Sequence, residues 1–281
     1  MRVVVTGAGG QLGRSLQRAL TSHEVVMLSH AALDVADPAG VEAVLRSSSP
    51  DAIVHAAAWT DVDGCETDPE RARLVNVGGT QNVVESAGSA YVVCVSTDYV
   101  FNGSASRPYV ETDDTEPVQM YGLTKLDGER VALASGARAA VARTAWLYGD
   151  GGRNFVGAIV RALRKGDPID VVDDQVGSPT SCDDLARAIA LMLEGQPTGV
   201  FHVVDGGEVS RCGFARAIAA GIGVDPGLVR AIATEAAPPR PAKRPSYAPL
   251  EGAAWRKEGF DDLPGWDDAL ARALPSILAT M

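Results

Sequence analysis

The first half of the chain alternates between short apolar runs and longer amphipathic stretches. Runs such as RVVVTG (2–7), DAIVHAAAW (51–59) and YVVCVST (91–97) are almost continuously hydrophobic, and helix-like segments such as QLGRSLQRALTS (11–22) separate them. Strands of this kind, separated by helices, are typical of a parallel sheet covered on both faces. The pattern therefore predicts an α/β fold with a doubly wound, Rossmann-like parallel sheet.

The alternation weakens in the second half. A long helix is predicted over residues 120–134, and a strand over residues 139–149 follows it. Beyond these come helix-like residues 155–166, 183–195 and 212–221, a polar loop at 171–182, a strand at 199–206 and an irregular, proline-rich segment at 235–249. We expect a dinucleotide-binding domain over residues 1–149. Residues 150–281 should form mainly a smaller substrate-binding lobe, which can return strands or helices to the first domain and lies over the carboxyl ends of its strands.

Composition narrows the class of protein. The chain has 281 residues, 46% of them hydrophobic, and a formal charge of -11 without long runs of one sign. That charge argues against nucleic acid and anionic membranes as partners. Four widely spaced cysteines without a C-x-x-C pair indicate neither a zinc site nor a disulfide framework. Because no signal-peptide pattern or long apolar run occurs, we expect a cytoplasmic protein without a membrane segment.

Three glycines follow the first predicted strand. Gly7, Gly10 and Gly13 lie in VVVTGAGGQLGRSL, where a helix opens. Glycine lets the backbone turn sharply and approach a pyrophosphate, which binds the amides of a helix N-terminus. Leu12 stands where the G-x-G-x-x-G pattern of many dehydrogenases has glycine, and a purely structural turn is the alternative. The position directly after the first strand favours a dinucleotide site.

The ends of the next two strands concern the choice of cofactor. After EVVML the chain has Ser29 and His30, where an acidic residue would bind the adenosine ribose of NAD. Without a carboxylate to repel a 2′-phosphate, we expect NADPH or NADH to bind, with a preference for NADPH. Asp34 is either a helix cap or an adenine contact. The small residues of HAAAW (55–59) permit close approach of a cofactor, or tight packing of a helix.

A tyrosine and a lysine share one helix face in YGLTK. Tyr121 and Lys125 are four positions apart, and VSTDYVFNG precedes them at the end of a predicted strand. Reduction of a carbonyl needs a hydride and a proton. Because the pKa of tyrosine is about 10, an ammonium group one turn away that favours the phenolate would help proton transfer. The hydroxyl of Thr97 or Ser96 could donate a second hydrogen bond to the carbonyl oxygen.

In this order, these motifs resemble the extended short-chain dehydrogenase/reductase superfamily. The segments STDYVF, ETDDTEP, YGLTKLDGE, RTAWLYG, NFV and DQVGSPT are similar to the dTDP-4-dehydrorhamnose reductases over nearly the whole chain. The resemblance implies an enzyme with a nucleotide-sugar substrate. Its reaction would be the NAD(P)H-dependent reduction of the 4-keto group of dTDP-4-dehydro-L-rhamnose to dTDP-L-rhamnose.

The resemblance also implies roles for individual residues. Thr97, Tyr121 and Lys125 match the family's catalytic hydroxyl, proton donor and lysine, and the lysine also holds the nicotinamide ribose. Matches on the cofactor side are Gly7, Gly10, Gln11, Leu12, Gly13, Asp34, Val35, Ala56, Ala57 and Ala58, and Asn76 is a cofactor-side or a structural residue. Matches on the substrate side are Thr97, Asp98, Tyr99, Trp146, Asn154, Gln175 and Thr180, with Arg244 a candidate for the diphosphate.

Some features depart from the family or leave alternatives open. Arg14 and Ser15 stand where some members carry a glutamate that helps to bridge a magnesium-linked dimer, so we expect no metal and either a monomer or a homodimer. A nucleotide-sugar epimerase or dehydratase is a second hypothesis, because Asp98 lies beside the catalytic hydroxyl. Tyr99 and DQVGSPT favour the reductase. A non-catalytic regulatory subunit is a third hypothesis, which the Tyr121 and Lys125 pair disfavours.

Overall fold

A six-stranded parallel sheet forms the centre of the protein, which we describe from a computed structural model over residues 1–152 and 154–281. Its strands are β1 (Arg2–Thr6), β2 (Glu24–Leu28), β3 (Ala52–His55), β4 (Tyr91–Thr97), β5 (Ala139–Thr144) and β10 (Gly199–His202). They lie in the order β10-β5-β4-β3-β1-β2. Because the strand order reverses between β1 and β3, the crevice that binds ligands in such sheets lies at the carboxyl ends of these two strands.

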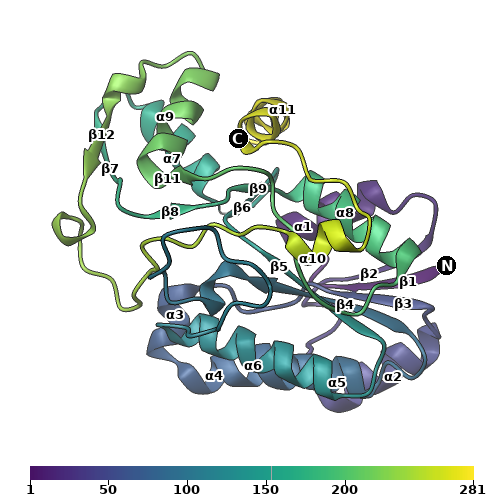
Figure 1. Cartoon of the computed structure of the whole chain (residues 1–281). Helices are drawn as coiled ribbons and strands as arrows, with labels where there is room; N and C mark the ends of the chain where they lie inside the picture. Colours follow the sequence, from purple (N-terminus) through teal and green to yellow (C-terminus); the bar gives the residue numbers. More distant parts are fainter. Residues whose placement is uncertain (153) are drawn as a thin grey trace.

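Helices cover both faces of this sheet, as Figure 1 shows. On one face lie α1 (Gln11–Ala19), α8 (Cys182–Gly195) and α10 (Ala253–Lys257), and on the other α2 (Pro38–Ser48), α4 (Pro69–Arg73), α5 (Gly79–Glu85) and α6 (Met120–Ala134). Side chains of β1 alternate between the two layers: Val3 and Val5 pack with Leu16 of α1, and Val4 packs with Val41 of α2. Both faces are apolar, which confirms the predicted doubly wound sheet.

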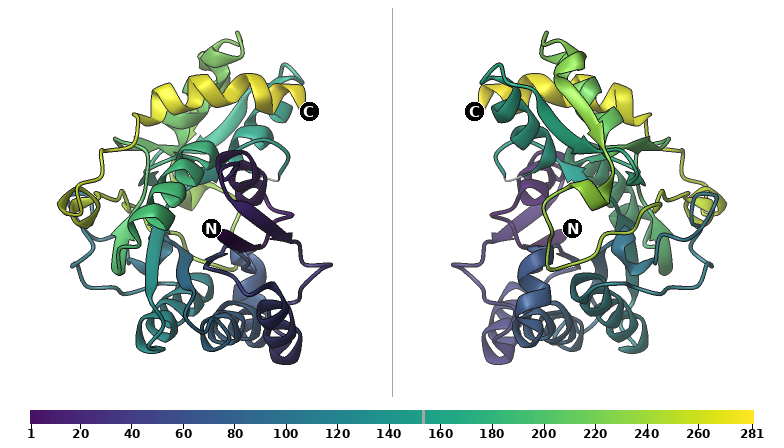
Figure 2. Two further views of the ribbon diagram at one scale, coloured as in Figure 1. Left: turned by 90° about the vertical axis from the view of Figure 1, so that its right-hand side faces the viewer. Right: turned by 90° about the vertical axis from the view of Figure 1, so that its left-hand side faces the viewer.

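A smaller lobe lies over one end of the sheet and has its own apolar core (Figures 1 and 2). It contains the helices α7 (Phe155–Leu163), α9 (Arg211–Gly221) and α11 (Trp266–Ala279). Its strands pair two by two: β6 (Leu147–Tyr148) with β9 (Thr180–Ser181), β7 (Ile169–Val172) with β12 (Val229–Ile232), and β8 (Val176–Gly177) with β11 (Val209–Ser210). In Figure 2, α11 lies on the side of the molecule opposite α2.

Several short elements complete the described chain. These are α3 (Val62–Thr67), the π-helical turn η1 (Leu74–Gly78) and the 3-10 turns η2 (Asp98–Val100), η3 (Pro226–Leu228) and η4 (Thr234–Ala236). Within residues 1–152 and 154–281, no helix is both long and apolar enough to cross a bilayer.

The prediction of α6 from the sequence is confirmed, but the predictions for several segments that follow it were wrong. The strand expected over residues 139–149 is broken, because Trp146 has a φ of 43° and turns the chain from β5 into the lobe. The expected polar loop at 171–182 contains parts of three short strands, which form only by pairing with distant segments. α8 and β10, beyond the expected boundary at residue 149, pack on and within the large sheet. We propose that the boundary expected at residue 149 marks only the start of the lobe, which the chain first enters after β5, and not a separation of two independent domains.

Candidate active site

The glycine turn lies at the switch point of the sheet. Gly7 has a φ of +73°, and a Cβ there would lie 2.7 Å from the backbone of Ala56 and Ala57 after β3. Gly10 caps α1 without a side-chain hydrogen bond, so backbone amides are the donors at this helix N-terminus. Gly13 packs so closely that a Cβ would overlap the backbone of Ala8. A backbone cradle at a helix N-terminus fits the pyrophosphate of a dinucleotide.

His55, at the end of β3, links this strand to the end of β1 and to α5, beside the glycine turn. Its Nδ1 lies 2.9 Å from the hydroxyl of Thr6, and its Nε2 lies 3.2 Å from that of Thr80. Because Thr80 donates to the carbonyl of Asn76, it accepts from Nε2, and Nδ1 accepts from Thr6. Burial, helped by the charge of Lys125, lowers the pKa of His55 to about 3. This imidazole is therefore a neutral structural link.

Two residues assigned by resemblance to the cofactor side have structural contacts. Asp34 is exposed and accepts a hydrogen bond from the amide of Ala36, whereas Asp37 provides the cap of α2 that was considered for Asp34. The side chain of Val35 is buried against Gly79 of α5.

The amide of Asn76 links the loop after β3 to α6. It exchanges hydrogen bonds with the backbone of Trp59, at 2.8 and 3.3 Å, and donates to the hydroxyl of Thr124 at 3.0 Å. These contacts favour the structural role over the cofactor contact for Asn76.

The start of α6 places Tyr121 beside the end of β4. Gln119 caps the helix by accepting from the amide of Gly122 at 2.5 Å. A Cβ on Gly122 would overlap the carbonyl of Tyr99, so glycine allows α6 to approach η2. The Tyr99 and Tyr121 rings meet edge to face, with centroids 6.0 Å apart. This packing places the Tyr121 side chain near Thr97, which acts to lower the Tyr121 pKa.

The ionisation of Tyr121 differs from the sequence expectation. Burial raises its pKa, and the neighbouring Asp98 acts in the same direction, whereas the hydrogen bond with Thr97 lowers it. Lys125, which the sequence predicted would lower this pKa, is not among the groups that shift it. In this structure Tyr121 therefore keeps its proton at neutral pH, as a proton donor must.

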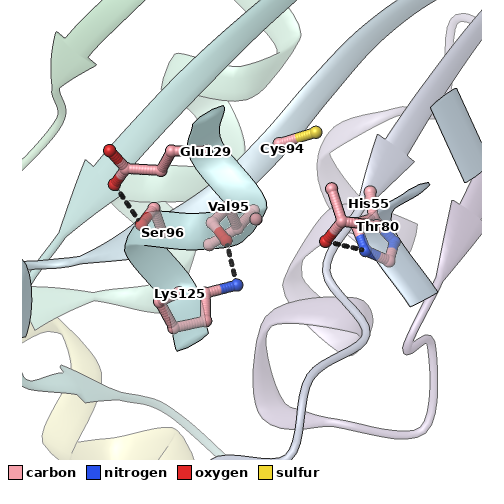
Figure 3. A pocket seen from close by; sticks show the side chains of 8 residues that line it. His55, Thr80, Cys94, Val95, Ser96, Lys125 and Glu129 are labelled. Atoms are coloured by element: carbon pink, nitrogen blue, oxygen red, sulfur yellow. Dashed lines mark hydrogen bonds between the residues drawn. The ribbon is translucent and has the colours of Figure 1, made fainter. Parts of the chain in front are cut away.

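Lys125 points to the strand side of α6, as Figure 3 shows. Its ammonium donates to the carbonyl of Val95 at 2.7 Å, and burial lowers its pKa. It lines a cavity of about 10 Å³ together with Cys94 and Glu129, a space about the size of one water molecule. Tyr121 and Lys125 thus both face the carboxyl end of β4, at successive positions along it.

Asp98 is a buried carboxyl group next to Thr97. Its Oδ1 accepts from the Thr97 hydroxyl at 3.0 Å, and its Oδ2 is buried without a hydrogen-bond partner in the part of the chain that the structure describes. Burial raises the pKa of Asp98 to about 7, although the hydrogen bond from Thr97 and the charge of Arg211 oppose this. Asp98 can thus carry a proton at neutral pH.

Arg211 is a site residue that sequence reasoning missed. It is the first residue of α9, and its guanidinium lies 3.4 Å from the ring centroid of Trp146 and 5.1 Å from that of Phe155. The indole of Trp146 also packs on Gly177, where a Cβ would lie 2.5 Å from the ring. Because Arg211 covers one face of the indole, that face does not offer the sugar contact predicted for Trp146.

Arg244, the candidate for the diphosphate, is paired within the protein. It donates to Asp63 of α3 and to the carbonyl of Ala242, both at 2.6 Å. Burial raises the pKa of Tyr99, and the charges of Arg211 and Arg244 both act to lower it, so both guanidinium groups lie near this side chain. The proline-rich segment is therefore joined to the sheet domain by an ion pair, and two guanidinium groups converge on Tyr99.

Three predicted substrate residues make contacts within the protein. Asn154 caps α7 and donates to Gln11 at 3.1 Å, which links α1 to the lobe. The side chain of Gln175 donates to Thr234 at 3.1 Å, and its carbonyl accepts from the amide of Arg211 at 3.0 Å. Thr180 has no exposed surface, and its hydroxyl binds backbone atoms. The structure does not bring Thr180 to the surface of the site, contrary to the expectation.

These features define a class of enzyme. A glycine turn at the switch point of a parallel sheet, followed by a threonine at the end of β4 and a tyrosine and lysine on α6, is the arrangement of a nicotinamide-dependent short-chain dehydrogenase/reductase.

Comparison with known proteins identifies the family. The RmlD substrate binding domain family matches residues 1–278. A dTDP-4-dehydrorhamnose reductase of Mycobacterium tuberculosis is 43% identical over 97% of this chain and 92% of its own length. A dTDP-4-keto-6-deoxy-D-glucose reductase of Streptomyces niveus is 38% identical over 99% and 98%. The crystal structure of the Bacillus anthracis dTDP-4-dehydrorhamnose reductase in complex with NADP has a TM-score of 0.94, with 33% identity over 98% of each chain. The chain belongs to the dTDP-4-dehydrorhamnose reductase family.

Proposed function

We propose that this enzyme reduces the 4-keto group of a dTDP-linked 4-keto-6-deoxyhexose. Its substrate would be dTDP-4-dehydro-L-rhamnose and its product dTDP-L-rhamnose, with NADPH preferred over NADH. The observation that carries the proposal is the placement of Thr97 at the carboxyl end of β4 beside Tyr121 of α6, in the same sheet whose switch point holds the glycine turn. The names of the relatives support this substrate class.

In this mechanism the side chains act on the keto oxygen. The reduced nicotinamide, when bound, supplies the hydride that C4 accepts. Tyr121 donates its proton to the oxygen, and its raised pKa means that the proton is present at neutral pH. Thr97 donates a hydrogen bond to the same oxygen and stabilises the negative charge that develops there.

Lys125 supports the tyrosine after proton transfer. Its ammonium is fixed on the Val95 carbonyl, one helical turn from Tyr121. A fixed positive charge attracts a nearby phenolate more strongly in a buried site than the same charge would in bulk water. We assign Lys125 this role and the binding of the nicotinamide ribose.

Arg211 and Arg244 are suited to the anionic part of the substrate. Their guanidinium groups converge on Tyr99 at the edge of the lobe, and the protein as a whole carries a formal charge of -11. Local guanidinium groups are therefore needed to bind a diphosphate. We propose that Arg211 contacts the diphosphate, while Arg244 and Asp63 hold the proline-rich segment next to it.

The decisive experiment measures reduction directly. Purified enzyme is given dTDP-4-dehydro-L-rhamnose with NADPH, and both the absorbance of NADPH and the sugar product are followed. We expect one NADPH oxidised per dTDP-L-rhamnose formed. GDP- and UDP-linked keto sugars and dTDP-4-keto-6-deoxy-D-glucose serve as comparison substrates.

A variant at the proton donor tests the mechanism. Tyr121→Phe should lower kcat by roughly a thousandfold while it keeps its affinity for NADPH, because only the hydroxyl is removed. A Tyr121→Phe kcat close to that of the wild type would contradict the mechanism.

In the wild-type reaction, product formation without net NADPH oxidation would indicate an epimerase or dehydratase instead.

A further inference from the structure

The reduction described above leaves the carboxyl group of Asp98 without a role. It lies beside the reacting groups, with 2% of its residue surface exposed and one oxygen unpartnered in the described chain. The charged or titratable groups that face it are Arg211 from α9, Tyr121 from α6 and Tyr99 from its own turn. Thr97 at the end of β4 is its hydrogen-bond donor.

The Thr97 hydroxyl has one hydrogen and several neighbours. Its oxygen accepts from the amide of Tyr99 at 3.2 Å, and its hydrogen is directed at Oδ1 of Asp98. A hydroxyl can donate only one hydrogen bond at a time. To polarise the keto oxygen, Thr97 must therefore release Asp98.

The charge of Asp98 decides how readily that happens. An ionised carboxylate accepts a charge-assisted hydrogen bond about twice as strong as a neutral one, so it holds the hydrogen of Thr97. A protonated carboxyl is a weaker acceptor and has a hydrogen of its own to donate to the Thr97 oxygen.

We propose that Asp98 is a positioning residue that acts through Thr97: neutral Asp98 frees the Thr97 hydrogen for the 4-keto oxygen, and ionised Asp98 withdraws it. The inference rests on the proposed function and adds to it a control on the catalytic hydroxyl. The proton of Asp98 does not enter the balance of the reaction, since hydride adds to C4 and the proton on oxygen comes from Tyr121.

The pH dependence of hydride transfer tests this proposal. Single-turnover oxidation of NADPH with saturating dTDP-4-dehydro-L-rhamnose is followed from pH 6 to pH 9. The wild-type rate should fall as the pH rises. If the enzyme with ionised Asp98 is inactive, the fall between pH 6.5 and 8.5 is roughly twentyfold. That range follows from the pKa of about 7 that burial gives Asp98.

Three variants separate the possible causes of such a fall. Asp98→Asn has no charge to gain, so its lower rate should vary less than about twofold across this range. Thr97→Val should also lose the alkaline fall, because the hydroxyl through which Asp98 acts is gone. Asp205→Asn is the matched control: Asp205 is also a buried carboxyl with a raised pKa, but its partner is the amide of Ser181, and this variant should keep the fall.

The outcomes are distinct. An alkaline fall that persists in Asp98→Asn would overturn the proposal, and so would one that persists in Thr97→Val. Thermal unfolding and NADPH binding check that each variant is folded, and Thr97→Val carries the test if Asp98→Asn is not. Absence of turnover by the wild type on every dTDP-4-keto-6-deoxysugar would instead contradict the proposed function itself.

Discussion

The cofactor end and the substrate lobe of this enzyme are built in different ways. At the cofactor end, one strand, one turn and one helix supply Gly7, Gly10 and Gly13, and the loop after β3 adds Ala56 and Ala57. In the lobe, the cluster around Arg211 combines Trp146 after β5, Gly177 in β8 and the first residue of α9. The glycine turn is therefore local in sequence. The cluster around Arg211 forms only when three distant segments of the chain come together.

This difference suggests that the two ends can be altered separately. A change in the glycine turn should act on the dinucleotide, and a change at Arg211 should act on the sugar nucleotide. The strongest test of the comparison is a set of variants in which each affects one ligand and spares the other.

Gly7→Ala should have the largest effect. Alanine at a φ of +73° is strained, and its Cβ would lie 2.7 Å from the backbone of Ala56 and Ala57. We expect a loss of about 2–3 kcal/mol in NADPH affinity, or roughly a hundredfold in Kd. Fluorescence titration with NADPH measures it. Gly88→Ala is the control, because Gly88 also has a positive φ but its Cβ would meet no atom within 4 Å. Equal NADPH affinities for the two variants would contradict this role for Gly7.

Arg211→Ala should raise the KM for the sugar nucleotide by roughly tenfold to thirtyfold. The reason is the loss of a cation that stacks on the indole of Trp146 and whose backbone amide donates to the carbonyl of Gln175. The affinity for NADPH should stay within about twofold, since the affected contacts lie in the lobe. Arg230→Ala, which removes an exposed arginine paired with Asp170 in the same lobe, is the control. A comparable loss of NADPH affinity in Arg211→Ala would break the division between the two ends.

Ser29→Asp should change cofactor choice by a smaller amount. Ser29 follows β2 and lies beside the glycine turn. A Cβ added to Gly9 of that turn would be 3.6 Å from the Cβ of Ser29. A carboxylate there can bind the ribose diol of NADH and repels the 2′-phosphate of NADPH. Repulsion of about 1 kcal/mol should move the ratio of the two kcat/KM values roughly fivefold to tenfold toward NADH. An unchanged ratio would mean that the 2′-phosphate does not approach β2.

Asp205→Asn should have the mildest effect, on stability alone. Burial raises the pKa of Asp205 to about 8, above its ordinary value of 3.8. Between these values the folded protein binds a proton that the unfolded chain has released, so stability falls as the pH rises and levels off above about 8. Asparagine removes this loss. The variant should therefore gain a few degrees in Tm at pH 8 relative to the wild type, and less at pH 5. A Tm difference that does not depend on pH would exclude Asp205 as the cause.

The hydrophobic pattern of the sequence was enough to predict those helices and strands whose side chains follow a regular period. The bounds of α6, the burial of β1 on both faces and the placement of Thr97, Tyr121 and Lys125 on their elements could be predicted. Each depends on hydrogen bonds or side-chain periods within one element. The resemblance to the family then added the chemistry, and the comparisons confirm that family.

Tertiary structure alone decided which side chains of the candidate site contact one another and which are buried. The pairing of Arg244 with Asp63, the covering of Trp146 by Arg211 and the complete burial of Thr180 depend on residues far apart in the chain. The raised pKa of Asp98 and that of Tyr121 likewise come from burial, which no single segment produces. The sequence by itself determined which groups could carry a proton. The packing of the lobe and of α6 against the sheet determined which of them hold it at neutral pH, because ionisation depends on how much water the fold removes.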